Sequence, residues 1–267
     1  MNGADIPQPE REHYDDVTPS TVTLLVEGER TPAMVFHPSS PGPVPGIAIG
    51  QEATGPNTFI RSVAATLAHL GYATVVPDYY HGGGPSDPEN YEDLDGIVEH
   101  MADLDFRRGA DDMIAGIDYL KSLASVDPQR LGVWGYCTGA TMALLAAALD
   151  RTVRASILFY PSQPRFTALG VKTPIHPIDL IWNIRSPVLW ITGEADPVWP
   201  SDLLAEVRQR LTRWHIAHRI RTYPNAGHAF CSPAPTLHHA DAARAAWVDA
   251  VAFVATHLGA TAPSAGA

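Results

Sequence analysis

Two patterns of hydrophobic and polar residues alternate along this chain. The first is a short run rich in β-branched and other apolar residues. The later of these runs are nearly continuously apolar, which is typical of β-strands covered on both faces. Strands are predicted at residues 21–26, 32–37, 45–49, 73–76, 131–134, 155–159, 187–191 and 217–222.

The second pattern, between the strands, places apolar residues at helical spacing. It predicts helices at residues 58–70, 108–124, 138–149, 200–213 and 237–258. In 108–124, for example, Met113 and Ile117 fall on one face, whereas Asp111 and Asp112 are expected on the surface.

Strands that alternate with helices predict an α/β fold, with a mostly parallel central sheet and helices on both faces. Only a few residues join the first two strands, so an antiparallel hairpin is expected at one sheet edge. We assign one domain to residues 16–260, a frayed extension to 1–15 and a disordered tail to 261–267. Functional residues are expected in the loops at the carboxyl ends of the strands.

Composition narrows the class of protein. The 267 residues are 45% apolar and 18% charged, which is ordinary for a globular chain, and the net charge of −11 argues against nucleic acid as a partner. No apolar stretch approaches the roughly 20 residues that span a bilayer, and the polar N-terminus does not resemble a signal peptide. We therefore expect a cytoplasmic protein that has no membrane partner.

One of the two cysteines lies in a motif typical of a nucleophile. Residues 135–139 read GYCTG, between a predicted strand and an Ala-rich predicted helix. This is the G-x-S-x-G nucleophile elbow with Cys137 in the serine position. Glycines on either side allow the strand and helix to approach, and the helix N-terminus favours a thiolate. A structural cysteine beside a tight turn is the alternative.

A nucleophile of this kind needs a base and an acid that orients it, in the chain order nucleophile, acid, histidine. Asp196 follows the strand at 187–191, and His228 follows the strand at 217–222. Glu194 is a rival for the acid, and Asp196 has an alternative role as a helix cap. His228 is the one of the 12 histidines that follows a late strand in the required order.

The remaining thiol and histidines give weaker signals. Cys231 follows His228 closely, and packing in a loop is its simpler interpretation. His238 and His239 are adjacent on a predicted helix, so they point to different faces and lack the spacing of metal ligands. We expect neither a metal nor another cofactor.

In these features the chain resembles the dienelactone hydrolases, α/β-hydrolase-fold enzymes with a Cys-His-Asp triad. The matching segments are QEATGPN at 51–57, GYATVVPDYY at 71–80, GYCTG at 135–139, Gly193 with Asp196, and AGHAF at 226–230. They occur in order from about residue 20 to the last predicted helix.

The resemblance implies a role for each matching residue. Cys137 would be the nucleophile, His228 its base and Asp196 the orienting acid, while Glu52 would pair with the resting thiol and help to form the thiolate. The backbone N–H groups of Ala53 and Thr138 would form the oxyanion hole. Substrate contacts would come from Tyr80, His81, Tyr136 and Phe230. Capping of the helix at 58–70 is an alternative role for Glu52.

The chain departs from the family at two arginines that grip the substrate carboxylate. His81 stands where the first is expected, and Ser232 stands near the position of the second. Residues 160–185 also form a long segment, a candidate flap that carries Arg165 and Trp182. We therefore predict a hydrolase of small carboxyl esters or lactones, acting as a monomer or homodimer. The alternative is a catalytically weak protein of the same fold that binds a ligand or senses oxidants through its thiol.

Overall fold

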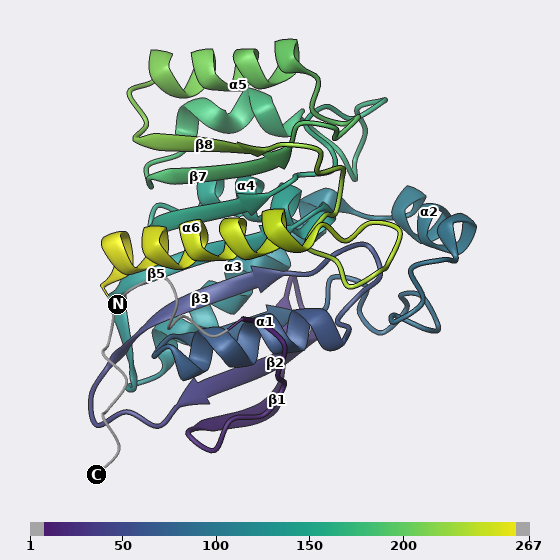
Figure 1. The fold of residues 1–267 in the computed structure, drawn as a ribbon. Coiled ribbons are helices and arrows are strands. Elements are labelled where there is room, and N and C mark those ends of the chain that lie inside the picture. The colour runs from purple at the N-terminus through teal and green to yellow at the C-terminus, as the bar shows by residue number, and fades with distance from the viewer. Residues whose placement is uncertain (1–7, 260–267) are drawn as a thin grey trace.

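A computed structural model describes residues 8–259, which form one eight-stranded sheet with helices on both faces (Figure 1). The strands are β1 (Val17–Val26), β2 (Glu29–Pro38), β3 (Val44–Gly50), β4 (Ala73–Pro77), β5 (Val126–Tyr136), β6 (Val153–Phe159), β7 (Val188–Gly193) and β8 (His218–Tyr223). Their order in the sheet is β1-β2-β4-β3-β5-β6-β7-β8. Only the β1–β2 and β2–β4 pairs are antiparallel. The predicted fold class and edge hairpin are confirmed.

Within residues 8–259, seven helical segments lie between or after these strands. They are α1 (Thr58–His69), α2 (Leu94–Ala102), α3 (Phe106–Ser122), α4 (Thr138–Leu149), the 3₁₀ helix η2 (Pro177–Asn183), α5 (Ser201–Arg213) and α6 (Ala240–Leu258). The sequence pattern did not predict α2 or η2. Both are short, and each lies in a long loop whose Pro, Asp and Gly residues obscure helical periodicity.

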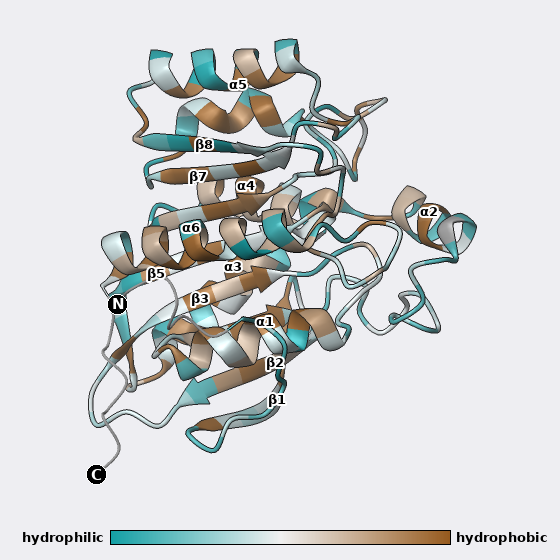
Figure 2. Cartoon of the chain, in the orientation of Figure 1, coloured by the Kyte–Doolittle hydropathy of each residue, from teal (hydrophilic) through white to brown (hydrophobic). Residues whose placement is uncertain are grey.

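The helices divide the core into two layers. α1 and α6 cover one face of the sheet, and α3, α4, η2 and α5 cover the other. The strands in the middle of the sheet are largely hydrophobic, whereas β1 and β8 at the edges carry many polar residues (Figure 2). Because both faces of the central strands are covered, these strands are apolar throughout rather than alternating.

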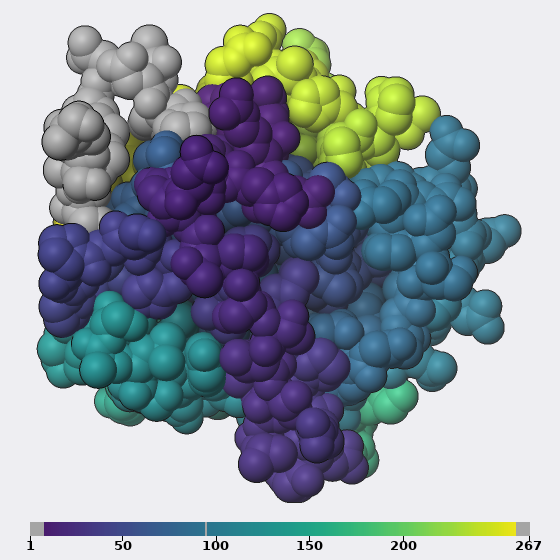
Figure 3. All heavy atoms as spheres, turned by 90° about the horizontal axis from the view of Figure 1, so that it is seen from below, coloured from purple at the N-terminus to yellow at the C-terminus, as the bar shows by residue number. Residues whose placement is uncertain are grey.

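Residues that precede β1 lie against α1 instead of extending freely. The Tyr14 hydroxyl is 3.1 Å from the Thr66 Oγ1, and the carboxylate of Glu12 pairs with Arg61. Figure 3 shows these residues together with β1 and β2, in purple, as a band across one face of the molecule. The predicted loose extension therefore does not describe residues 12–14. The predictions for residues 1–7 and 260–267 lie outside the described residues.

The loops that leave β3 to β8 at their carboxyl ends share one edge of the sheet, because these six strands are parallel. All the predicted site residues lie at this edge. Within residues 8–259, no helix has the length and apolar character needed to cross a membrane.

Close backbone contact fixes the elbow after β5. A Cβ atom added to Gly139 would lie 2.2 Å from the carbonyl carbon of Gly50, and one added to Gly135 would lie 2.4 Å from the Gly139 oxygen. The Gly139 N–H donates to the Gln51 oxygen at 2.9 Å. The glycines of the GYCTG motif thus allow α4 to begin directly against the end of β3.

We expect Gly139→Ala to lower the free energy of unfolding by about 3 kcal/mol or more, because backbone atoms must move to admit a methyl group. Gly42→Ala is the matched control, since a Cβ at Gly42 meets nothing within 4 Å. Urea denaturation followed by circular dichroism measures both. Equal stability of the two variants would contradict this account of the elbow.

Candidate active site

Cys137 occupies the strained position of the elbow. Its φ of 51° and ψ of −116° lie in a region that non-glycine residues seldom adopt, and it is the N-cap of α4. The residue is 8% exposed. The turn places its thiol at the carboxyl edge of the sheet, within 3.2 Å of the His228 imidazole.

The three predicted triad residues are brought together. The His228 Nε2 is 3.2 Å from the Cys137 Sγ, and the His228 Nδ1 is 2.9 Å from the Asp196 Oδ2. A carboxylate only accepts, so Nδ1 carries a proton and Nε2 faces the sulfur. Asp196 is itself held by the Val198 N–H at 2.9 Å, whereas Glu194 is exposed. Asp196 is therefore the acid that contacts His228.

The charge environment of His228 favours its protonated form. Burial alone lowers the pKa of the imidazole, but the neighbouring Cys137 sulfur and the Asp196 carboxylate outweigh it and raise the pKa to about 10. The imidazole is therefore disposed to keep a proton taken from the thiol at neutral pH. This arrangement can hold a thiolate–imidazolium pair.

Two backbone amides have the character expected of an oxyanion hole. Within the described chain, no acceptor takes the N–H of Ala53 or Thr138, although both residues are buried. Thr138 is the first residue of α4, where the helix leaves its amides unpaired. Ala53 belongs to the loop after β3, which is bonded to the elbow through the Gln51 oxygen and the Gly139 N–H.

Two tyrosines form hydrogen bonds with the backbone of that loop. The Tyr79 hydroxyl donates to the backbone carbonyl oxygens of Glu52 at 2.7 Å and Gln51 at 3.0 Å, and it lies 2.7 Å from the Thr138 Oγ1. The Tyr80 hydroxyl donates to the Ala53 oxygen at 2.7 Å. Tyr80 thus contacts the backbone of the site.

Glu52 is buried near the triad, but its carboxylate faces two tyrosines. Tyr91 donates to Oε2 at 3.0 Å and Tyr160 donates to Oε1 at 3.2 Å, while Asn57 donates to the Tyr91 hydroxyl at 2.5 Å. Burial raises the pKa of Glu52 to about 7, in spite of both hydrogen bonds. Asn57, not Glu52, caps α1.

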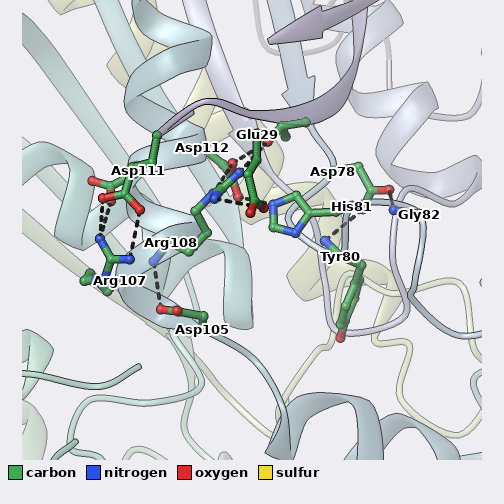
Figure 4. Close-up of polar contacts among 12 residues, drawn as sticks. Glu29, Asp78, Tyr80, His81, Gly82, Asp105, Arg107, Arg108, Asp111 and Asp112 are labelled. Atoms are coloured by element: carbon green, nitrogen blue, oxygen red, sulfur yellow. Dashed lines mark hydrogen bonds and ion pairs between the residues drawn. The ribbon is translucent and has the colours of Figure 1, made fainter. Parts of the chain in front are cut away.

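Three of the four predicted substrate contacts have other neighbours. The Tyr136 ring packs against Phe159 and Phe59 and is 1% exposed, and Phe230 is fully buried against Tyr160. These rings support the site from the core. The His81 imidazole lies 2.9 Å from the Asp112 carboxylate on α3 (Figure 4). Asp112 is itself fully buried, which corrects its predicted place on the helix surface.

The remaining candidates have partners outside the triad. Arg165 pairs with Glu206 at 2.6 Å, and the Phe166 ring packs on Phe106, so the segment at 160–185 is attached to α3 and α5. Cys231 is buried, and burial raises the pKa of its thiol well above the usual value. Among residues 8–259 no group of three or more His, Cys, Asp or Glu side chains is arranged to hold a metal ion.

Comparison with known proteins identifies the family. Residues 31–258 match the profile of the "Dienelactone hydrolase family". This chain belongs to the dienelactone hydrolase family. The resemblance seen in the sequence is thereby confirmed, and the family indicates a hydrolase of carboxylic esters or lactones.

Individual family members are similar over nearly their whole length. A Bradyrhizobium protein named "Probable 2-oxo-3-(5-oxofuran-2-ylidene)propanoate lactonase" is 30% identical over 237 residues, covering 89% of this chain and 94% of that one. The Escherichia coli K12 protein named "Putative carboxymethylenebutenolidase" is 28% identical over 241 residues, with coverage of 87% and 85%. The structure of a "Putative Dienelactone Hydrolase" from Klebsiella pneumoniae matches with a TM-score of 0.78 at 26% identity, covering 90% and 99%.

Several residues around this dienelactone hydrolase site were not singled out from the sequence. Tyr160 directly follows β6 and has a φ of 39°, so its place at a carboxyl strand end was a usable signal. Tyr79 lies in the PDYY segment beside Tyr80. Tyr91 had no such signal, because its contacts with Asn57 and Glu52 join segments that are distant in the sequence.

The raised pKa of Glu52 predicts that the free energy of unfolding depends on pH. Between pH 4.5 and about 7 the folded protein binds this proton more tightly than the unfolded chain, so the free energy of unfolding falls as pH rises through that range. A shift of this size corresponds to about 3 kcal/mol. In Glu52→Gln, which lacks the ionisation, this fall should be absent.

Urea denaturation of both proteins from pH 4.5 to 8 tests the prediction. The stability difference between Glu52→Gln and wild type should grow in favour of the variant until about pH 7 and then level off. Glu194→Gln, which alters an exposed carboxylate, serves as control. A difference that is constant with pH would rule out a buried, titrating Glu52.

Proposed function

We propose that this dienelactone hydrolase family member cleaves carboxylic esters or lactones with Cys137 as the nucleophile. The observation that carries the proposal is the continuous contact from the Cys137 Sγ through the His228 imidazole to the Asp196 carboxylate. Such a chain is how proteins activate a thiol for acyl transfer.

The reaction would proceed in two stages. The Cys137 sulfur attacks the acyl carbon, and the carbonyl oxygen becomes an oxyanion that accepts from the amides of Ala53 and Thr138. His228 gives its proton to the departing alkoxide, which leaves an acyl-thioester on Cys137. His228 then takes a proton from water, hydroxide adds to the thioester, and the thiolate leaves as the carboxylic acid is released.

Glu52 would have a different part from the one that the family resemblance implies. Its two carboxylate oxygens accept from Tyr91 and Tyr160, so the Cys137 thiol is paired with His228 in the free protein. We infer that the nucleophile is assembled before substrate arrives. Glu52 would instead place a negative or protonated carboxyl group beside the substrate, according to pH.

We expect Cys137→Ala to lower kcat/KM for aryl acetates and small lactones by about 10³-fold or more, because members of a triad act as a unit. Cys231→Ala is the matched control, since it also removes a buried thiol. Initial rates of the three purified proteins give the comparison. Equal activity of Cys137→Ala and wild type would reject the assignment and favour a ligand-binding or thiol-sensing protein.

The site also suggests a substrate class. Two cationic candidates are already paired within the protein: His81, at the first expected arginine position, is bonded to Asp112, and Arg165 is bonded to Glu206. The carboxyl group of Glu52 would repel a second carboxylate once ionised. We infer a preference for uncharged esters and lactones, unlike the propanoate in the name of the Bradyrhizobium relative.

A matched pair of substrates tests this preference. For a lactone that bears a carboxylate and its methyl ester at the same position, kcat/KM should be at least about tenfold higher for the uncharged compound at pH 8. Hydrolysis of the ring is followed by chromatography, so that cleavage of the methyl ester is counted separately. Faster turnover of the carboxylate would contradict the inference without affecting the role of Cys137.

The cytoplasm, and a monomer or homodimer, remain the expected setting. Both are predictions made from the sequence alone.

A further inference from the structure

A fully buried carboxylate lies behind the site, and the mechanism does not use it. Asp112 on α3 accepts from three segments of the chain: Thr31 Oγ1 on β2 at 2.7 Å, Arg108 Nε on α3 at 3.3 Å, and His81 Nε2 after β4 at 2.9 Å. Figure 4 shows His81 pointing into this cluster. A buried carboxylate with three donors is well satisfied, so it forms a rigid anchor.

His81 belongs to a tight turn that Asp78 closes. The two carboxylate oxygens of Asp78 accept from the backbone amides of Tyr80 at 3.0 Å and Gly82 at 2.8 Å. The backbone N–H of His81 donates to the backbone oxygen of Asp78 at 2.9 Å. The backbone of His81 has a φ of 54° and that of Gly82 has a φ of 83°. With positive φ, the His81 side chain turns back toward α3, away from the triad.

The other end of the same turn holds the loop of the oxyanion site. The Tyr79 and Tyr80 hydroxyls reach the backbone oxygens of residues 51–53, and Tyr79 also reaches the Thr138 side chain. The turn therefore connects the Asp112 anchor to Ala53 and Thr138, whose amides would form the proposed oxyanion hole. Within this short segment, His81 is the side chain bonded to α3.

We propose that the Asp112–His81 pair positions the Ala53 amide, through Tyr79 and Tyr80, for stabilisation of the oxyanion. This inference rests on the proposed function. His81 and Asp112 are positioning residues that do not touch the substrate. Their effect should appear in the formation of the tetrahedral intermediate, because small displacements of an oxyanion donor strongly reduce the rate.

The variants are chosen so that only the link to Asp112 changes. His81→Asn keeps the tolerance for positive φ, but its amide is too short to reach the carboxylate. His81→Gln extends an N–H to the place of the imidazole Nε2 and should restore the link. The matched control is His69→Ala, which breaks a His–Asp pair of 2.8 Å on α1, with the histidine 32% exposed against 33% for His81.

Two measurements separate positioning from general damage. The first is kcat and KM for an aryl ester. The second is the rate of alkylation of Cys137 by iodoacetamide, which requires the thiolate and His228 but forms no oxyanion. We expect His81→Asn to lower kcat about tenfold, with KM and the alkylation rate each within about twofold of wild type. His81→Gln and His69→Ala should behave like wild type.

Tyr80→Phe provides a second route that leaves the turn intact. It removes the hydroxyl at the far end of the link, so it should also lower kcat while sparing alkylation. This keeps the proposal testable where His81→Asn is poorly folded, which thermal unfolding would reveal.

Several results would overturn the proposal. An unchanged kcat in both His81→Asn and Tyr80→Phe would do so, as would an equal loss of turnover and alkylation. A loss confined to KM would instead assign His81 to substrate contact, from the hollow of about 380 Å³ that it lines with Tyr80, His100 and Lys172. Each of these failures leaves turnover by wild type dependent on Cys137. If that dependence is absent, the proposed function itself fails.

Discussion

The backbone contact between β3 and α4 is the constraint on which the site depends. The end of one central strand and the beginning of the next helix approach so closely that Gly50 and Gly139 have no room for side chains. This approach brings the Cys137 turn beside the loop that carries Ala53. Cys137 and Ala53, from segments more than 80 residues apart, thus lie at one junction, which is where the proposed nucleophile and oxyanion donor would have to meet. The tyrosines and carboxylates around them adjust a geometry that the junction has already determined.

Electrostatics then divides the acidic groups into distinct roles. Asp196 accepts from His228 and favours a proton on the imidazole, whereas buried Glu52 has a raised pKa and faces two tyrosine hydroxyls. Asp112 is as deeply buried, but a guanidinium and an imidazole lie against it. Carboxylates of similar burial therefore have different hydrogen-bond donors: two tyrosine hydroxyls at Glu52, and a guanidinium and an imidazole at Asp112. The overall charge of the chain carries no information about these local differences.

Much of this could be predicted from the sequence, because the signals were local. Apolar runs located all eight strands, and the GYCTG motif located the Cys137 turn by the glycines that its geometry requires. What was missed depends on contacts between distant segments. Helical spacing assigned Asp112 to the surface, since nothing in its own helix indicates that His81 and Thr31 lie opposite it. Tyr136 and Phe230 lie next to motif residues in the sequence, but their side chains point into the core.

The Asp112 cluster has a consequence for how the protein is assembled. Its donors come from β2 in the antiparallel edge of the sheet, from α3 and from the loop after β4. The link from Asp112 through the His81 turn to the Ala53 loop therefore has all its hydrogen bonds only when β2 is paired with the sheet. Local opening of this edge would loosen one side of the site while Cys137, His228 and Asp196 stayed in contact. The edge hairpin would thus help to hold the loop that carries Ala53, the proposed oxyanion donor.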